Sequence, residues 1–257
     1  MNDITYRRPI EWDTSQLTDV GMVRKVNEDA IFAKPELGLW AVADGMGGHA
    51  VGDVASRMIV EALDEVDEQS NLSDFVDAVE NALIDVNRRI IDYAQLMFDS
   101  ATMGSTVACL LIRGRVGVCL WAGDSRLYRL RNQQLSQLSR DHSHVQELLE
   151  MGEIEEHEVD NHPQGNVITR AIGVDPEGKI DINVFNTQMG DTFLLCSDGL
   201  HNTVDQNTLV ALLSSAETDK VADNLVHASL DKGAPDNVSV VIVRGEAATI
   251  GYGTESL

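Results

Sequence analysis

Basic residues are scarce in this sequence, and their scarcity limits the partners that the protein can have. Nineteen Lys and Arg residues stand against 42 Asp and Glu residues, so the net charge is -23 at pH 7. Such an acidic chain repels nucleic acid and anionic membrane surfaces unless a local basic patch overrides the net charge. The basic residues are scattered and form no such patch. We therefore expect no nucleic acid and no membrane among the partners.

Long apolar runs and disulfide-type cysteine patterns are also missing. No stretch approaches the ~18 apolar residues that a membrane-spanning helix needs, and residues 1–9 contain no apolar core of signal-peptide length. The three cysteines, Cys109, Cys119 and Cys196, each lie within an apolar run, where a thiol behaves as a small hydrophobic side chain. An odd set of buried cysteines favours a reducing compartment. We expect a soluble, cytoplasmic protein.

The chain shows no repeat, linker or low-complexity segment that would divide it. Its 257 residues are enough for one large domain with a substantial core. We predict an N-terminal arm over residues 1–12, a single domain over residues 13–245 and a tail over residues 246–257. Residues 141–178 combine many acidic side chains with several glycines, and we predict that they form a short helix and an exposed flap.

Hydrophobic periodicity predicts where the helices and strands lie. Apolar residues recur at helical spacing over residues 54–66 and 72–97, each with an acidic outer face. Further helices are predicted over 205–213 and 218–230, and strands over 17–21, 30–33, 39–43, 105–112, 116–122, 127–130, 135–138, 180–185, 191–197 and 238–243. Short polar links join the strands between residues 105 and 138, so consecutive strands there must be antiparallel. The clustering of helices and of strands indicates an α+β fold.

Four aspartates lie beside apolar strands at turns. Asp44, Asp124 and Asp198 each follow an apolar run, and Asp236 stands just before the last predicted strand. Carboxylates gathered at one site would repel each other strongly unless cations neutralised them. Oxygen ligands suit Mg²⁺ or Mn²⁺, and two such ions can share a water, lower its pKa and present it as a nucleophile.

Each motif taken alone has a simpler explanation. Asp-Gly is an ordinary turn signal in an acidic chain. Cys109 and Arg115 have the Cys-x5-Arg spacing of a thiol phosphatase, but the residues between them form no glycine-rich cradle, which favours a core cysteine. His142 and His144 lack further zinc ligands at a matching spacing, and the glycines within residues 45–48 match no nucleotide-binding motif. No Gly-x-Ser-x-Gly motif of a serine hydrolase is present.

Taken together, five motifs in one order resemble those of a known family. They are Val20-Gly21-Met-Val-Arg24-Lys-Val-Asn27-Glu28-Asp29, Asp44-Gly-Met-Gly-Gly-His49, Gly123-Asp-Ser-Arg126, Ser197-Asp-Gly199 and Asp236-Asn237. From about Asp13 to Arg244, the chain resembles the metal-dependent serine/threonine phosphatases of the protein phosphatase 2C family, in their compact bacterial form. This resemblance implies a four-layer αββα sandwich, with two antiparallel sheets face to face, helices outside, and a binuclear metal centre at one edge.

The family pattern implies which residues hold the metal ions. Asp44 would bridge two Mn²⁺ or Mg²⁺ ions, and Gly45 would offer its carbonyl oxygen to one of them. Asp198 and Asp236 would hold the other ion. Asp124, together with Asp198, would match a third-ion site that bacterial relatives have.

The family pattern also implies roles for the residues around these ligands. Glu28 and Asp29 would position metal-bound waters, and Arg24 would bind the substrate phosphate. The leaving alkoxide needs a proton. Animal relatives resemble Asp-Gly-His where this chain has Met46, and His49, three residues on, is one candidate for the acid. A structural role for His49, with a metal-bound water as the acid, is the alternative.

The resemblance implies hydrolysis of phosphoserine and phosphothreonine in proteins by a metal-bridged water, and we expect this activity to reverse a serine/threonine kinase. The expected partners are phosphorylated proteins and a cognate kinase, and the chain is expected to be a monomer. Two alternatives stay open: a catalytically silent module that binds phosphoproteins or a kinase, and a phosphatase that acts on small phosphoesters. In the family the flap borders the site, and Arg170 is expected to lock the flap rather than contact substrate.

Overall fold

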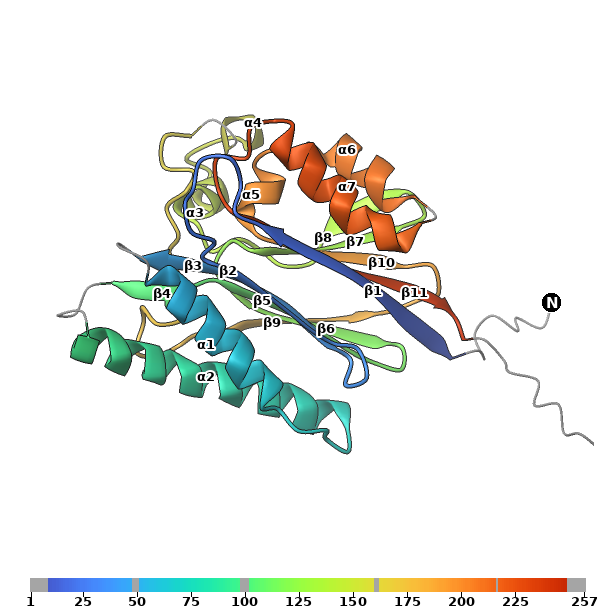
Figure 1. The fold of residues 1–257 in the computed structure, drawn as a ribbon, viewed down its shortest axis with the longest axis horizontal. Coiled ribbons are helices and arrows are strands. Elements are labelled where there is room, and N and C mark those ends of the chain that lie inside the picture. The colour runs from blue at the N-terminus through green and yellow to red at the C-terminus, as the bar shows by residue number, and fades with distance from the viewer. Residues whose placement is uncertain (1–8, 48–50, 98–101, 160–161, 216, 249–257) are drawn as a thin grey trace, which may run out of the picture.

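Two β-sheets packed face to face form the centre of the protein, with helices on both outer sides (Figure 1). The computed structural model describes residues 9–47, 51–97, 102–159, 162–215 and 217–248. Both the predicted α+β class and the predicted four-layer sandwich are confirmed.

Helices and strands occur along the chain in clusters. In chain order the elements are β1 (Ile10–Asp19), β2 (Asp29–Lys34), β3 (Leu39–Gly47), α1 (Gly52–Asp64), α2 (Leu72–Met97), β4 (Met103–Ser105), β5 (Val107–Arg113), β6 (Val116–Ala122), β7 (Arg126–Arg131), β8 (Gln134–Gln137), α3 (His144–Met151), α4 (Glu156–Val159), β9 (Asp181–Asn186), β10 (Thr192–Cys196), α5 (Asp198–His201), α6 (Gln206–Leu213), α7 (Thr218–Leu230) and β11 (Val238–Ala247). Among the described residues, no helix combines the length and the apolar character that crossing a membrane requires.

The strand pairs within each sheet are antiparallel. One sheet has the order β1-β11-β10-β7-β8, and the other has the order β2-β3-β5-β6-β9, with β4 paired to the end of β3. β1 pairs with β11 along its whole length, from Ile10 opposite Ala247 to Asp19 opposite Val238. The sheet therefore includes residues 10–12 of the predicted arm and residues 246–247 of the predicted tail.

Three apolar layers hold the sandwich together. Trp40 and Phe193 are fully buried between the two sheets. On one outer face, Leu63 of α1 and Leu83 of α2 pack on the sheet that contains β3 and β5, and on the other Leu225 of α7 packs on the sheet that contains β10 and β11. Burying each such side chain, rather than leaving it exposed, stabilises the fold by about 1.5–3 kcal/mol. Strands β3, β5 and β10 are covered on both faces, which fits the continuous apolar runs that their sequences contain.

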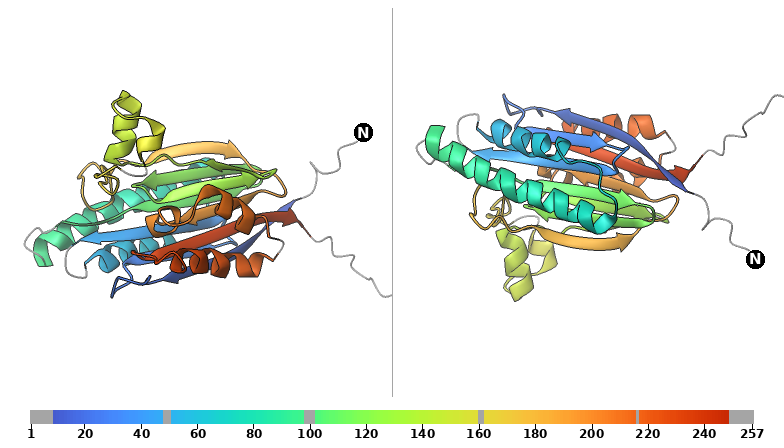
Figure 2. Two further views of the ribbon diagram at one scale, coloured as in Figure 1. Left: turned by 90° about the horizontal axis from the view of Figure 1, so that it is seen from above. Right: turned by 90° about the horizontal axis from the view of Figure 1, so that it is seen from below.

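The flap stands out from one edge of the sandwich (Figure 2). Asn87 of α2, whose side chain is buried, anchors the C-terminal end of the flap. Its Oδ1 accepts from the Gly173 amide at 2.6 Å, and its Nδ2 donates to the Asp175 carbonyl oxygen at 2.9 Å. Arg170 forms an ion pair with Asp181 at the start of β9. This contact is of the kind expected for a residue that locks the flap.

Candidate functional site

Strand register brings the predicted acidic residues to one edge of the sandwich. Asp29 on β2 lies directly opposite Asp44 on β3. Asp198 follows the end of β10 and Asp236 precedes the start of β11, and these two strands are paired. The charges of Asp29, Asp124, Asp198 and Asp236 all act on Asp44. The tertiary structure therefore gathers five carboxyl groups that lie far apart in the chain, which we call the carboxylate cluster.

Burial and mutual repulsion raise the pKa values of Asp29, Asp44, Asp124 and Asp198. Burial is the largest cause for each of these four, and it raises the pKa of Asp29 and of Asp124 from 3.8 to about 7 and that of Asp198 to about 6. The pKa of Asp44 is raised well above its usual value, first by burial and then by the charges of its neighbours. The surroundings of these four carboxyl groups therefore disfavour their charged forms.

Hydrogen bonds stabilise only part of the cluster. Ser197 Oγ donates to Asp29 Oδ2 at 2.8 Å, and Asn202 Nδ2 donates to Asp198 Oδ2 at 3.2 Å. The Oδ1 atoms of Asp29 and Asp124 are buried and have no hydrogen-bond partner. Leaving such an atom unpaired costs about 1–3 kcal/mol, and more when the group is charged. A hard divalent cation is a partner that would compensate this cost.

The geometry itself fits the expected ions only in part. Among the described residues, no group of three Asp, Glu, His or Cys side chains is arranged to hold one ion. Asp236 Oδ2 already has a partner, since it accepts from Arg24 Nη2 at 2.6 Å. The donor atoms are nevertheless all anionic oxygens, two of them buried and unpaired. The chemistry of the donor set therefore fits Mn²⁺ or Mg²⁺.

Arg24 and Glu28 lie on the loop between β1 and β2, beside the cluster. The Arg24 side chain is 52% exposed, and its hydrogen bond to Asp236, followed by the charges of Asp236, Glu28 and Asp198, raises its pKa. The Glu28 carboxylate lies against the start of α1, since a Cβ on Gly52 would be 2.8 Å from Glu28 Oε1, and the helix dipole there favours an anion. The role of Glu28 in positioning metal-bound water stays a prediction.

The glycines that follow two of the aspartates are required by close packing of the main chain. A Cβ atom on Gly45 would lie 2.1 Å from the carbonyl oxygen of Gly52, and one on Gly199 would lie 1.9 Å from that of Asn237. A larger residue at Gly45 would push β3 away from the start of α1, and one at Gly199 would push apart the segments that carry Asp198 and Asp236. His49, the candidate acid, lies outside the described residues.

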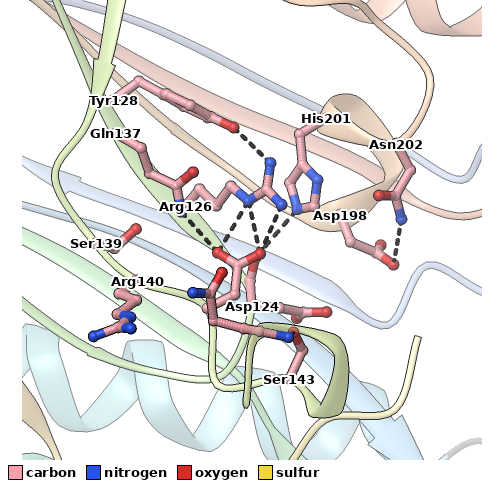
Figure 3. Close-up of polar contacts among 12 residues, drawn as sticks. Asp124, Arg126, Tyr128, Gln137, Ser139, Arg140, Ser143, Asp198, His201 and Asn202 are labelled. Carbon is pink, nitrogen blue, oxygen red and sulfur yellow. Dashed lines mark hydrogen bonds and ion pairs between the residues drawn. The ribbon is translucent and has the colours of Figure 1, made fainter. Parts of the chain in front are cut away.

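A largely buried ion pair lies close to Asp124 (Figure 3). Arg126 donates to Asp141 through Nη2 at 2.6 Å and through Nε at 3.0 Å, and its Nη1 donates to the Tyr128 hydroxyl at 2.8 Å. Nε2 of His201 lies 3.1 Å from the Asp124 carbonyl oxygen. Burial lowers the pKa of His201 to about 3, so this ring is neutral at pH 7. The His201 contact is made to the main chain of Asp124 and leaves the Asp124 carboxylate for other partners.

Asp141→Ala is expected to destabilise the fold by about 3 kcal/mol, because breaking a buried pair leaves the Arg126 charge without its partner. The two side chains are only 24% and 11% exposed. Glu150→Ala is the matched control, since it removes an ion pair with Arg140 whose side chains are 59% and 39% exposed. The control should change stability by less than about 0.5 kcal/mol. Urea unfolding of both variants measures the difference, and equal effects would contradict a stabilising role of the Arg126–Asp141 pair.

The structure disfavours the alternative chemistries considered from the sequence. Cys109 is buried in β5, and burial raises the pKa of its thiol to about 12, so it is a poor nucleophile. His142 Nδ1 accepts from the Gly123 amide at 3.1 Å, and its ring stacks on Trp121 with a centroid distance of 6.0 Å. His144 is the first residue of α3. Both histidines therefore belong to the framework of the flap.

Sequence reasoning missed the polar residues that hold the cluster in place. Thr106 Oγ1 accepts from the Asp44 amide at 3.1 Å and lies 2.7 Å from Ser125 Oγ. Ser197 bonds to Asp29, and Asn237 bonds to three main-chain groups around Arg24. One signal was available, because a hydroxyl or amide residue stands directly beside Asp124, Asp198 and Asp236 in the sequence.

Comparisons with known proteins agree with this arrangement. Residues 23–232 match the family described as protein phosphatase 2C. The serine/threonine phosphatase stp of Listeria monocytogenes is 38% identical to this chain over 236 residues, which cover 88% of this chain and 93% of the relative.

Solved structures show the same fold at comparable identity. A structure described as PppA, a key regulatory component of T6SS in Pseudomonas aeruginosa, superimposes with a TM-score of 0.85 at 45% identity, covering 92% of this chain and 99% of the other. The catalytic domain of the serine/threonine protein phosphatase PstP, in complex with 2 manganese ions, superimposes with a TM-score of 0.82 at 32% identity, again covering 92% and 99%.

Proposed function

The chain belongs to the protein phosphatase 2C family, and on this basis we propose that it hydrolyses phosphoserine and phosphothreonine in proteins with the help of Mn²⁺ or Mg²⁺ ions. The observation that supports this most strongly is the carboxylate cluster. It combines raised pKa values and unpaired buried oxygens with an exposed arginine at the same edge of the sandwich.

The carboxylate cluster is where the ions would bind. Asp44 would bridge two ions, the Gly45 carbonyl would serve one, and Asp198 and Asp236 would hold the other. Asp124 and Asp198 would provide a third site. When bound, the ions supply an activated water and draw in the negative charge of the phosphate. Burial of the carboxylates supports the assignment, because it disfavours their charge unless a cation compensates it.

Arg24 is the residue that would bind the substrate. A phosphorylated serine or threonine carries close to two negative charges, so a chain with a net charge of -23 attracts it only through local cations. The planar guanidinium suits bidentate binding of a phosphate. Its bond to Asp236 keeps it at the edge of the cluster, where its charge also acts on Asp198. Arg24 would orient the phosphorus atom toward the cluster.

His49 is the proposed proton donor to the leaving alkoxide. We expect His49→Gln to lower kcat for a phosphothreonine peptide on the order of a hundredfold, because an alkoxide leaves poorly without a proton. Turnover of p-nitrophenyl phosphate should change little, since its leaving group is stable as an anion. Steady-state kinetics on both substrates measure this difference. Equal losses on the two substrates would assign His49 a structural role.

The biological setting follows from the substrate chemistry. Phosphoserine and phosphothreonine are products of protein kinases, so we propose phosphorylated proteins and a cognate serine/threonine kinase as partners, in a signalling role. Three buried free cysteines support a reducing, cytoplasmic setting. We propose that the chain acts as a monomer.

Metal titration of the chelated protein tests the function. We expect no turnover of a phosphothreonine peptide after complete metal removal, recovery in Mn²⁺ or Mg²⁺, and a higher kcat/KM for the peptide than for p-nitrophenyl phosphate. Activity that survives metal removal would refute the proposal. Peptide binding without turnover in Mn²⁺ would favour the silent binding module, and a preference for the small ester would favour the small-phosphoester enzyme.

A further inference from the structure

The loop between β1 and β2, residues 20–28, carries Arg24, yet apolar packing does little to hold it. Met22, Val23 and Val26 are 67%, 68% and 43% exposed. Burial of apolar surface fixes most of the sandwich, but it contributes little here. A segment with few buried contacts opens easily unless other interactions restrain it. The position of Arg24 therefore depends on hydrogen bonds at the base of its loop.

Asn237, directly before β11, supplies three of those hydrogen bonds. Its Nδ2 donates to the carbonyl oxygens of Val20 at 2.9 Å and Val26 at 3.0 Å. Its Oδ1 accepts from the Glu28 amide at 2.8 Å. The residue is only 4% exposed. The side-chain amide of Asn237 thus uses both of its N–H hydrogens and its oxygen to hydrogen-bond main-chain groups at the two ends of the loop.

The same residue places the loop against the carboxylate that Arg24 contacts. The main-chain N–H of Asn237 donates to Asp236 Oδ1 at 2.9 Å, while Asp236 Oδ2 accepts from Arg24 Nη2 at 2.6 Å. The loop runs directly along this main chain, because a Cβ on Gly21, whose φ is +76°, would lie 2.1 Å from the Asp236 carbonyl oxygen.

Asn237 also lies against the segment that carries Asp198. A Cβ on Gly199 would be 1.9 Å from the Asn237 carbonyl oxygen, so the two main chains are in contact. Asn237 therefore connects the loop to two of the segments of the carboxylate cluster. A shift of this residue would change the distance from Arg24 to Asp198 and Asp236 together.

We propose that Asn237 is a positioning residue, which fixes the Arg24 loop relative to the carboxylate cluster and thereby sets the affinity for the phosphate monoester of the substrate. This inference rests on the proposed function of Arg24. The requirement is specific to an amide, because aspartate has no hydrogens to donate and alanine leaves three main-chain groups without partners. Asn237 acts through the loop and does not itself touch the phosphate.

A second tether limits the damage when Asn237 is replaced. Asn27 Nδ2 donates to Thr18 Oγ1 at 2.8 Å, and its Oδ1 accepts from the Asp29 amide at 3.1 Å. With this tether intact, loss of the Asn237 side chain should loosen the loop and leave the sheet in place.

Kinetics of four variants test the proposal: Asn237→Ala, Arg24→Ala, the double variant, and Asn71→Ala as the control. Asn71 also binds a main-chain amide, that of Asp74 at 2.9 Å, but it is exposed at the start of α2. In saturating Mn²⁺, Asn237→Ala should raise KM for a phosphothreonine peptide by about tenfold with a smaller change in kcat, since slight misplacement of a binding group is costly. Asn71→Ala should change neither constant.

The double variant decides whether Asn237 acts through Arg24. In the Arg24→Ala background, adding Asn237→Ala should raise KM by less than about twofold, because both changes remove the same contact. If KM of the double variant rose by the product of the two single effects, the proposal would be overturned, and Asn237 would have an effect independent of Arg24.

Limited digestion with trypsin tests the loop without relying on phosphatase activity. Arg24 and Lys25 are cleavage sites on the loop, and Asn237→Ala should raise the cleavage rate there by about tenfold. Cleavage after Lys179, an exposed residue elsewhere, should stay unchanged. An unchanged rate at Arg24 and Lys25 would overturn the proposal, even if wild type showed no Mn²⁺-dependent turnover and the proposed function failed. Should Asn237→Ala not fold, Asn237→Asp serves in the same digestion, since it keeps the bond from the Glu28 amide and loses the two donated bonds.

Discussion

Asp198→Asn is expected to abolish turnover of a phosphothreonine peptide in Mn²⁺ and, at the same time, to stabilise the metal-free protein. The change keeps a carbonyl oxygen in place of Asp198 Oδ2, which accepts from Asn202 Nδ2 at 3.2 Å. It removes, however, the negative charge that a divalent ion would need. The loss of kcat should be on the order of a hundredfold or more, as for other electrostatic groups aimed at developing charge.

The gain in stability follows from the repulsion within the carboxylate cluster. Burial and the charge of Asp236 raise the pKa of Asp198 to about 6, so its charged form at pH 7 opposes folding. Removing that charge should raise the free energy of unfolding in EDTA by about 1–3 kcal/mol. Urea unfolding in EDTA and in Mn²⁺ measures this change, and Mn²⁺ should stabilise the variant less than wild type.

Asp205→Asn is the matched control for this substitution. Asp205 is an exposed aspartate whose pKa is lowered to about 2, chiefly by the hydrogen bond from the Thr208 amide at the start of α6. Its charge therefore favours the folded state. The control should keep full turnover and should gain no stability. Equal turnover in wild type and Asp198→Asn would reject the metal assignment of Asp198.

In the absence of divalent ions, the free energy of unfolding is expected to fall as the pH rises from 5 to 8. In the folded protein, burial raises the pKa of Asp29 and Asp124 to about 7 and that of Asp198 to about 6, against 3.8 for an ordinary aspartate. Between these values the folded state binds more protons than the unfolded state. Raising the pH therefore favours unfolding, and the total fall should be on the order of a few kcal/mol.

Urea unfolding at several pH values in EDTA and in Mn²⁺ measures this dependence. Ions bound to the folded state stabilise it and neutralise the carboxylates, so Mn²⁺ should remove or reverse the slope. Asp124→Asn, which eliminates one raised pKa, should make the slope in EDTA shallower. A stability that is flat or rises between pH 5 and 8 in EDTA would contradict the burial of uncompensated charge in the cluster.

Local patterns predicted the amphipathic elements well and the polar edges poorly. The spacing of apolar residues predicts a helix over residues 72–97, and α2 runs from Leu72 to Met97. Residues 10–12 were expected in a loose arm, but they pair with residues 245–247 of β11. β1 is only half buried, and residues 13–16 are four polar residues in a row, so its sequence gives a weak strand signal. Its pairing with β11 is what makes it a strand.

The same division applies to the candidate site. The apolar runs beside Asp44, Asp124, Asp198 and Asp236 marked these residues in the sequence, because an acid at the end of a buried strand is a local feature. Nothing local predicted that Asn237 would bind both ends of the Arg24 loop, 209 to 217 positions away.

The sequence by itself determined the α+β class, most of the helices and strands, and the identity of the acidic residues, because these follow from periodicity and from neighbours along the chain. Only the tertiary structure decided that Asp29 lies opposite Asp44 and that the charges of four distant aspartates act on Asp44. It also decided how far their pKa values rise. Burial and charge repulsion depend on which distant segments meet, and strand register between those segments sets that.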